Sequence, residues 1–166
     1  MLIRSMLDAD IPAAAALLRR AAEEFILHES SPQDATAFLA EQGEQGLRGF
    51  VAAGYVYHVA LIEGELAGFA GVRARTHLYS LYVDKRFQRR GIARALWDAA
   101  RAAALEGAPD HPRSFTVNAS DHAVPWYAAQ GFVPCLDAHG AARTAPAKAP
   151  MKAPTVRSNP MRLILP

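Results

Sequence analysis

The sequence has few of the residues on which several classes of protein depend. Cysteine occurs once, at Cys135, so no disulfide can form within the chain, and a reducing cytoplasm is the expected compartment. No stretch reaches the roughly eighteen consecutive apolar residues of a membrane span. The N-terminus, Met1 to Arg4, lacks the basic and long apolar segments of a secretory signal. We therefore expect neither a membrane protein nor a secreted disulfide scaffold.

Charge of one sign is also lacking. The 18 Lys and Arg residues against 16 Asp and Glu leave a formal net charge of +2, which is too small to favour nucleic acid as a partner. Arg outnumbers Lys 15 to 3, which raises the capacity for bidentate phosphate binding per positive charge. His111 and His122 lack metal-ligand spacing with any Cys or carboxylate, so we expect no metal site.

The length of 166 residues predicts one domain, residues 1–166. Apolar spacing and capping residues predict strands and helices in alternation. The expected strands are 2–7, 55–63, 66–75, 77–83, 114–117, 132–136 and 161–165. The expected helices run from Asp8 or Asp10 to Phe25, from Ser31 to Gly43 or Gly46, from Ile92 to Gly107, and over 123–130. This order indicates an α/β fold with a mixed sheet and a helical crossover, and a long loop over 138–159.

The strongest functional signal is the segment from Leu81 to Ala93. A strand ends at Val83, a charged loop follows, and Gly91 introduces the next helix. A helix N-terminus offers unpaired N–H groups and a positive dipole end, and glycine lets the backbone approach closely, so this segment can bind a phosphate. A solvated loop with a turn-forming glycine is the alternative. The segment has neither the Gly-Lys-Ser/Thr of a Walker loop nor the Gly-x-Gly of a dinucleotide fingerprint.

Three segments together resemble the GNAT N-acetyltransferase superfamily. Gln88-Arg89-Arg90-Gly91-Ile92-Ala93 is similar to its acetyl-CoA motif, Q/R-x-x-G-x-G/A. Residues 117–132 resemble the family's fifth strand and the helix after it, and Asn159-Pro160-Met161-Arg162-Leu163 is similar to the closing strand of many small bacterial members. Two positions depart from the pattern: Ala93 replaces the last glycine, which the family commonly allows, and Lys85 replaces a frequent proline.

The resemblance implies a central twisted mixed sheet of six to seven strands flanked by about four helices, whose parallel middle strands splay apart. It implies that acetyl-CoA (coenzyme A) enters the gap as cosubstrate, and that its acetyl group passes by direct attack in a ternary complex to a primary amine of a small molecule or peptide. The cofactor-binding residues that it implies are Leu81, Tyr82, Val83, Gln88, Arg89, Arg90, Gly91, Ile92, Ala93, Arg94 and Asn118.

Tyr127 aligns with the family tyrosine that protonates the leaving thiolate, and packing beside Trp126 is the alternative for this residue. The family has no fixed position for the base. We favour His77, whose ordinary pKa near 6.5 suits base work at neutral pH, although a hydrogen-bonded structural histidine is the simpler explanation. Other candidates stay open: Glu23, Glu24, His28 and a water chain onto Tyr79 or the backbone.

Two other functions compete with catalysis. One is a non-catalytic module that binds acyl-CoA, which the presence of Tyr127 disfavours. The other is nucleic-acid binding by the Arg-rich loop and helix, which the many alanines of that helix disfavour because they offer few base-reading groups. The acceptor amine is not identified by the sequence. A homodimer, paired through a sheet edge or the terminal strands, is one option for the assembly.

Overall fold

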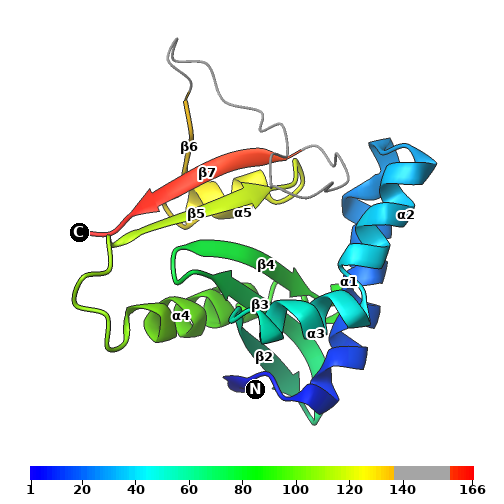
Figure 1. The fold of residues 1–166 in the computed structure, drawn as a ribbon, viewed down its shortest axis with the longest axis horizontal. Helices are drawn as coiled ribbons and strands as arrows, with labels where there is room; N and C mark the ends of the chain where they lie inside the picture. The colour runs from blue at the N-terminus through cyan, green and yellow to red at the C-terminus, as the bar shows by residue number, and fades with distance from the viewer. Residues whose placement is uncertain (137–157) are drawn as a thin grey trace.

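A computed structural model describes residues 1–136 and 158–166, and in them the chain forms one seven-stranded sheet with helices on both faces (Figure 1). The strands are β1 Leu2–Ser5, β2 Val56–Ile62, β3 Glu65–Arg73, β4 His77–Val83, β5 Ser114–Ala119, β6 Val133–Pro134 and β7 Asn159–Ile164. The helices are α1 Ile11–Phe25, α2 Pro32–Glu41, α3 Glu44–Ala52, α4 Ile92–Leu105 and α5 Val124–Ala129, with short 3-10 turns η1 Asp8–Asp10, η2 Leu27–Glu29 and η3 Lys85–Phe87. The expected long loop lies outside the described residues except for its last two positions.

The sheet is mixed, as the sequence predicted. Its strand order is β1-β2-β3-β4-β5-β7-β6, and every neighbouring pair is antiparallel except β4 and β5, which are parallel. Helix α4 makes the crossover between these two strands, because parallel neighbours need a long connection. The α/β fold class and the parallel middle strands are thus confirmed, and the seven strands agree with the expected six to seven.

The parallel pair diverges soon after it begins. β4 and β5 pair only at His77↔Thr116 and Leu78↔Val117, although β4 continues to Val83 and β5 to Ala119. β5 pairs with β7 over its whole length, whereas the second half of β4 has β3 as its only strand partner among the described residues. This confirms the predicted splay and leaves an opening between the C-terminal halves of β4 and β5.

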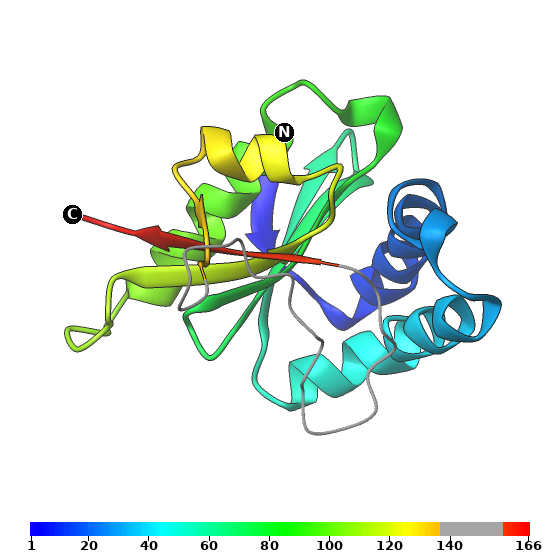
Figure 2. The same ribbon diagram turned by 90° about the horizontal axis from the view of Figure 1, so that it is seen from above.

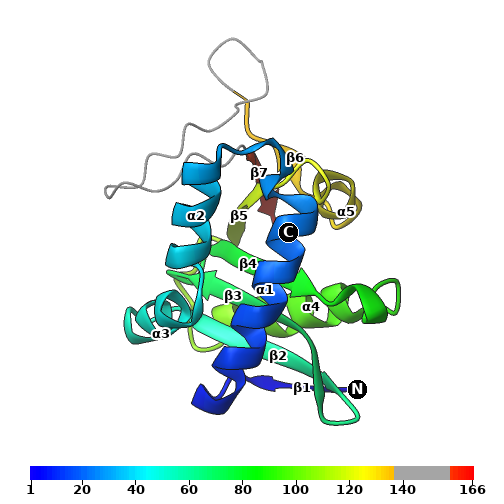
Figure 3. The ribbon, with the colours of Figure 1, turned by 90° about the vertical axis from the view of Figure 1, so that its right-hand side faces the viewer.

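Two apolar cores lie on opposite faces of the sheet. Helices α1, α2 and α3 cover one face, and α4 and α5 cover the other (Figure 2). On the α4 face, Trp97 is 1% exposed and its ring meets Phe115 edge-on, with centroids 5.1 Å apart. Figure 3 shows α1 running past β2, β3 and β4 toward β5, with α2 and α3 beside it. Helix α1 therefore lies near the opening between β4 and β5.

Local signals placed most helix starts correctly. Ser31 caps α2 by accepting a hydrogen bond from the Asp34 N–H, and prolines occupy the first turns of α1, α2 and α5. Helix α2 ends at Glu41, close to the predicted end at Gly43 and not at Gly46, and α3, which the sequence analysis did not predict, follows after a two-residue break. A Cβ on Gly46 would lie 1.5 Å from the Glu41 carbonyl oxygen, so this glycine permits a tight helix–helix turn.

Candidate functional site

The opening between β4 and β5 leaves one edge of β4 without a strand partner among the described residues. Leu81, Tyr82 and Val83 lie in this part of β4, beyond the last pair with β5, and on their other side they pair with β3. Alternate backbone N–H and C=O groups of a strand point toward each neighbour. The free edge can therefore bond an extended, amide-containing ligand in the way that an added strand would.

The loop after β4 directs a second set of backbone donors to the same end of the sheet. Gly91 caps α4 with φ of 78°, and the first N–H that bonds back into the helix is that of Ala95, to the Gly91 carbonyl. The N–H groups of residues 89–94 make no hydrogen bond within the part of the chain that the structure describes. A Cβ on Gly91 would meet nothing within 4 Å, so the space beside this residue is open. The arrangement fits an anion at the helix N-terminus.

The side chains of the same segment are exposed to solvent, buried in the core, or hydrogen-bonded to neighbouring elements. Arg89 and Arg90 are exposed, and Ile92 is buried in the core at 2% exposure. Gln88 ties the loop to the strand, because its Nε2 donates to the Val83 carbonyl at 3.2 Å. Arg94 links α4 to α5, with its Nε 3.3 Å from the Gln130 Oε1. The structure thus brings the residues predicted from Leu81 to Arg94 to one locus, with Ala93 half-buried beside them.

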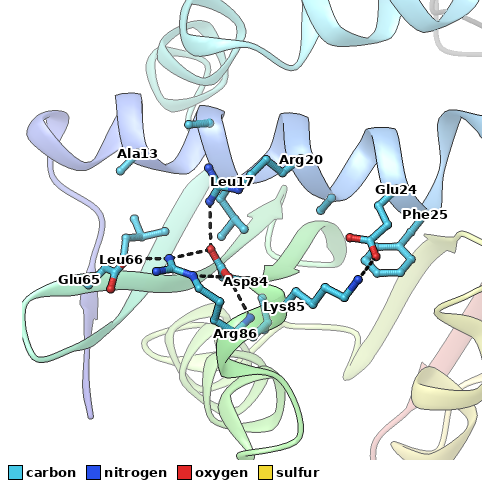
Figure 4. Close-up of a pocket in the computed structure, with 13 residues that line it drawn as sticks. Ala13, Leu17, Arg20, Glu24, Phe25, Glu65, Leu66, Asp84, Lys85 and Arg86 are labelled. Carbon is cyan, nitrogen blue, oxygen red and sulfur yellow. Dashed lines mark hydrogen bonds and ion pairs between the residues drawn. The ribbon is translucent and has the colours of Figure 1, made fainter.

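A buried carboxylate that the sequence analysis did not single out holds this loop. Asp84 is 4% exposed, accepts hydrogen bonds from the backbone and guanidinium of Arg86, and forms an ion pair with Arg20 of α1 at 3.0 Å (Figure 4). Hydrogen bonding to Arg86 is the main cause that lowers the pKa of Asp84 to about 2, against the opposing effect of burial. An Asp that directly follows a strand and precedes a loop was the available signal.

A groove of about 620 Å³ runs between α1 and the ends of β3 and β4 (Figure 4). Its apolar lining comes from alanines of α1 with Leu66 and Val83, and its charged lining includes the ion pair of Glu24 with Lys85. Phe25 lies at one end, where its ring stacks on His122 with centroids 4.3 Å apart. This contact joins α1 to the turn between β5 and α5, a proximity for which the sequence carried no signal.

Tyr127 lies on α5 in the α4-face core and is 6% exposed. Its ring meets those of Trp126 and Phe132 edge-on at 5.1 and 5.4 Å, so the packing alternative describes a real contact. Burial, and secondly the nearby Tyr82 hydroxyl of β4, raise the pKa of Tyr127 far above its ordinary value. The phenol therefore keeps its proton at neutral pH and lies within electrostatic reach of the unpaired part of β4.

His77 lies at the other end of β4, where the strands are still paired. Its Nδ1 is 2.7 Å from the Thr116 Oγ1, and burial followed by the Arg73 charge lowers its pKa to about 4. The imidazole is therefore neutral at pH 7. Asn118 is exposed on β5, beyond the last β4–β5 pair, and is opposite Pro160 of β7. The structure thus separates His77 from the loop around Gly91.

No three His, Cys, Asp or Glu side chains are grouped in residues 1–136 and 158–166 so as to hold a metal ion. No helix in these ranges has both the length and the apolar character needed to cross a membrane.

Solved structures with the same fold are numerous. A GCN5-related N-acetyltransferase from Rhodopseudomonas palustris has a TM-score of 0.77 and 24% identity, over 99% of this chain and 95% of that one. The PaiA N-acetyltransferase of Thermoplasma acidophilum, solved with coenzyme A, has a TM-score of 0.74 and 12% identity, over 99% and 98%. YncA of Salmonella typhimurium, solved with acetyl-CoA, has a TM-score of 0.64 and 18% identity, over 100% and 94%.

At these identities the structures show a common fold. A search of curated proteins found no significant match. The family model for the acetyltransferase (GNAT) domain matches residues 26–147, which is most of the chain and includes β4, the loop around Gly91, α4, β5 and α5. The protein therefore belongs to the GNAT acetyltransferase family.

Proposed function

We propose that residues 1–166 act as one acetyltransferase domain that transfers the acetyl group of acetyl-CoA to a primary amine. The observation that carries this proposal is the coincidence of two sets of free backbone donors. The unpaired edge of β4 and the N–H groups of residues 89–94 lie at the same end of a GNAT sheet, and they match an amide-containing arm joined to a diphosphate.

The coenzyme would occupy this site in two parts. Its pantetheine arm lies along Leu81, Tyr82 and Val83, with the Asn118 amide available to the arm from β5. Its diphosphate lies on the N–H groups of residues 89–94, where Gly91 allows close approach. The arginines of the motif add positive charge around the phosphates: Arg89, Arg90 and Arg94. Gln88 and Ile92 hold the loop in place: Gln88 is hydrogen-bonded to Val83 of β4, and Ile92 is buried in the core.

The transfer needs no covalent enzyme intermediate. The nitrogen of a neutral amine attacks the thioester carbonyl, a C–N bond forms, the C–S bond breaks, and the sulfur leaves as a thiolate. An N–H of the free β4 edge stabilises the negative charge that develops on the carbonyl oxygen. The thiolate takes its proton from a general acid, and the proton that the amine nitrogen loses passes to a base.

We assign the acid role to Tyr127 and the base role to His77. Burial keeps Tyr127 protonated, and its position near Tyr82 supports a place beside the thioester end of the arm. His77 is neutral at pH 7 and can accept a proton, and the pKa of about 4 that burial gives it makes it a weaker base than an exposed imidazole.

A thiol-release assay with acetyl-CoA tests the proposal, run across polyamines, amino acids, aminoglycosides and lysine peptides. Calorimetry with coenzyme A on the same preparation measures binding separately. We expect binding and amine-dependent release of free thiol. Tight binding with no release for any amine would favour the non-catalytic acyl-CoA module instead. An absence of binding would overturn the proposal.

A further inference from the structure

The base of the β4–β5 opening is marked by a bulge in β4. Gly71 of β3 pairs with Ser80 and Val72 pairs with Leu78, so Tyr79 is the extra residue between them. Leu78 is also the last residue of β4 that pairs with β5. Tyr79 is therefore the first residue of the free edge, and its side chain leaves the strand on the face covered by α2 and α3.

Three aromatic rings meet at this point. Phe50 stacks on Tyr55 with centroids 5.0 Å apart, and the Tyr79 ring meets both edge-on at 5.0 and 5.1 Å. All three residues are half-buried. We call Phe50, Tyr55 and Tyr79 the aromatic trio. It offers the stacked rings of Phe50 and Tyr55 with Tyr79 edge-on to both, at the first residue of the free β4 edge to which the pantetheine arm is assigned above.

Two hydrogen-bonding contacts hold the trio in place. Gln42, at the end of α2, is buried, and its Nε2 donates to the Tyr79 hydroxyl at 2.8 Å. The backbone N–H of Tyr55 donates to the Phe50 carbonyl at 3.0 Å. Beneath the bulge, the Tyr57 ring lies over Gly71 so closely that a Cβ there would be 2.2 Å from it. The surface is thus built in advance of any ligand, which lowers the entropic cost of binding.

Near Tyr79 lie one carboxylate and one guanidinium that have no ion-pair partner among residues 1–136 and 158–166. Glu41, next to Gln42, is half-buried, and its negative charge raises the pKa of the Tyr79 hydroxyl. Its carboxylate has no hydrogen bond or ion pair with any described residue. The Arg73 guanidinium lies 5.9 Å from the centre of the Tyr79 ring and likewise has no carboxylate partner in the described part of the chain. The charges elsewhere around the groove of α1 are paired, so this separated pair is unusual within the site.

We propose that the aromatic trio with Glu41 and Arg73 is the acceptor subsite, and that it takes a zwitterionic amine with a flat body, namely an aromatic amino acid. The ammonium group faces Glu41, the carboxylate faces Arg73, and the ring lies on the trio. The inference rests on the proposed function. Loss of one proton from the ammonium group gives the neutral amine, which then attacks the thioester as described above.

Three acceptors that share a benzyl side chain test the assignment: phenylalanine, phenylalaninamide and 2-phenylethylamine. Only the first carries a carboxylate, and all three carry the amine. We expect the wild type to prefer phenylalanine in kcat/KM. Arg73→Gln should lower kcat/KM for phenylalanine about tenfold more than for 2-phenylethylamine, because a change at His77, whose pKa the Arg73 charge lowers, acts on all three acceptors alike. Glu41→Gln should raise KM about tenfold for all three acceptors and leave KM for acetyl-CoA unchanged.

Arg75→Gln is the matched control, because Arg75 is exposed on the same β3–β4 turn but bonds to backbone carbonyls at the end of α4. It should leave all three acceptors unaffected. Calorimetry of phenylalanine with the protein saturated in coenzyme A gives a readout without turnover, and binding weakened in both subsite variants is the expected result. Absence of phenylalanine binding overturns the subsite, as does an equal response of all acceptors to Arg73→Gln. If coenzyme A binds and other amines react while phenylalanine does not, the proposed function stands and this inference fails.

Discussion

Replacing Gly91 by Ala separates the two demands that the coenzyme site places on this residue. Gly91 has φ of 78° and a Cβ there would meet no atom within 4 Å. The substitution therefore brings no clash with the protein, but it forces an L-residue into the left-handed region, at a cost of about 1 kcal/mol. For a chain of this length such a loss lowers Tm by roughly 2–4 °C.

Gly107 provides a matched control at the other end of α4. Its φ is 62° and a Cβ there would also meet nothing within 4 Å. Gly91→Ala and Gly107→Ala should therefore cost similar stability. Only the first places a methyl group beside the N–H groups of residues 89–94, where it would hold a diphosphate away from its donors. We expect affinity for coenzyme A to fall about tenfold in Gly91→Ala, or about 1.4 kcal/mol, and to stay unchanged in Gly107→Ala.

Calorimetry with two ligands completes the test. Coenzyme A carries the diphosphate, and pantetheine carries only the arm that is assigned to the edge of β4. Gly91→Ala should weaken the first ligand and leave the second unaffected. Unaltered affinity of Gly91→Ala for coenzyme A would refute the placement of the diphosphate, and equal losses in both glycine variants would show that the effect is one of general stability.

Three further predictions concern Tyr127, His77 and Gly71. Tyr127→Phe should lower kcat at least tenfold with little change in affinity for acetyl-CoA, because only the proton donor is lost; equal turnover would remove Tyr127 from the mechanism. Folding lowers the pKa of His77 from 6.5 to about 4, so the unfolded chain binds a proton at this residue more readily than the folded protein. The free energy of unfolding is therefore highest above pH 6.5 and decreases as pH falls from 6.5 to 4. Urea unfolding should show the wild type losing about 3 kcal/mol relative to His77→Gln over that range, and parallel curves would contradict the burial of a neutral imidazole. Gly71→Ala should lower the free energy of unfolding by about 2 kcal/mol through its clash with the Tyr57 ring, and by much less in a Tyr57→Ala background; equal costs in both backgrounds would show that the ring is not the obstacle.

The sequence determined the features that depend on neighbours along the chain. Ser31 and Pro32 marked the start of α2, and the Glu63-Gly64 turn marked the hairpin between β2 and β3, because caps and tight turns are set by a few adjacent residues. The segment around Gly91 was recognised for the same reason, since a strand end, a loop and a helix start are contiguous.

Tertiary structure decided what depends on residues far apart in the chain. The splay is one such feature: β4 and β5 pair at only two positions, after which β4 continues beside β3 and β5 continues beside β7. Neither the ion pair of Asp84 with Arg20 nor the placing of Glu41 and Arg73 on either side of Tyr79 has a local signal. Periodicity reports which face of an element is buried, but the partner across that face is chosen only when the chain packs, and the acceptor side of this site is made entirely of such partners.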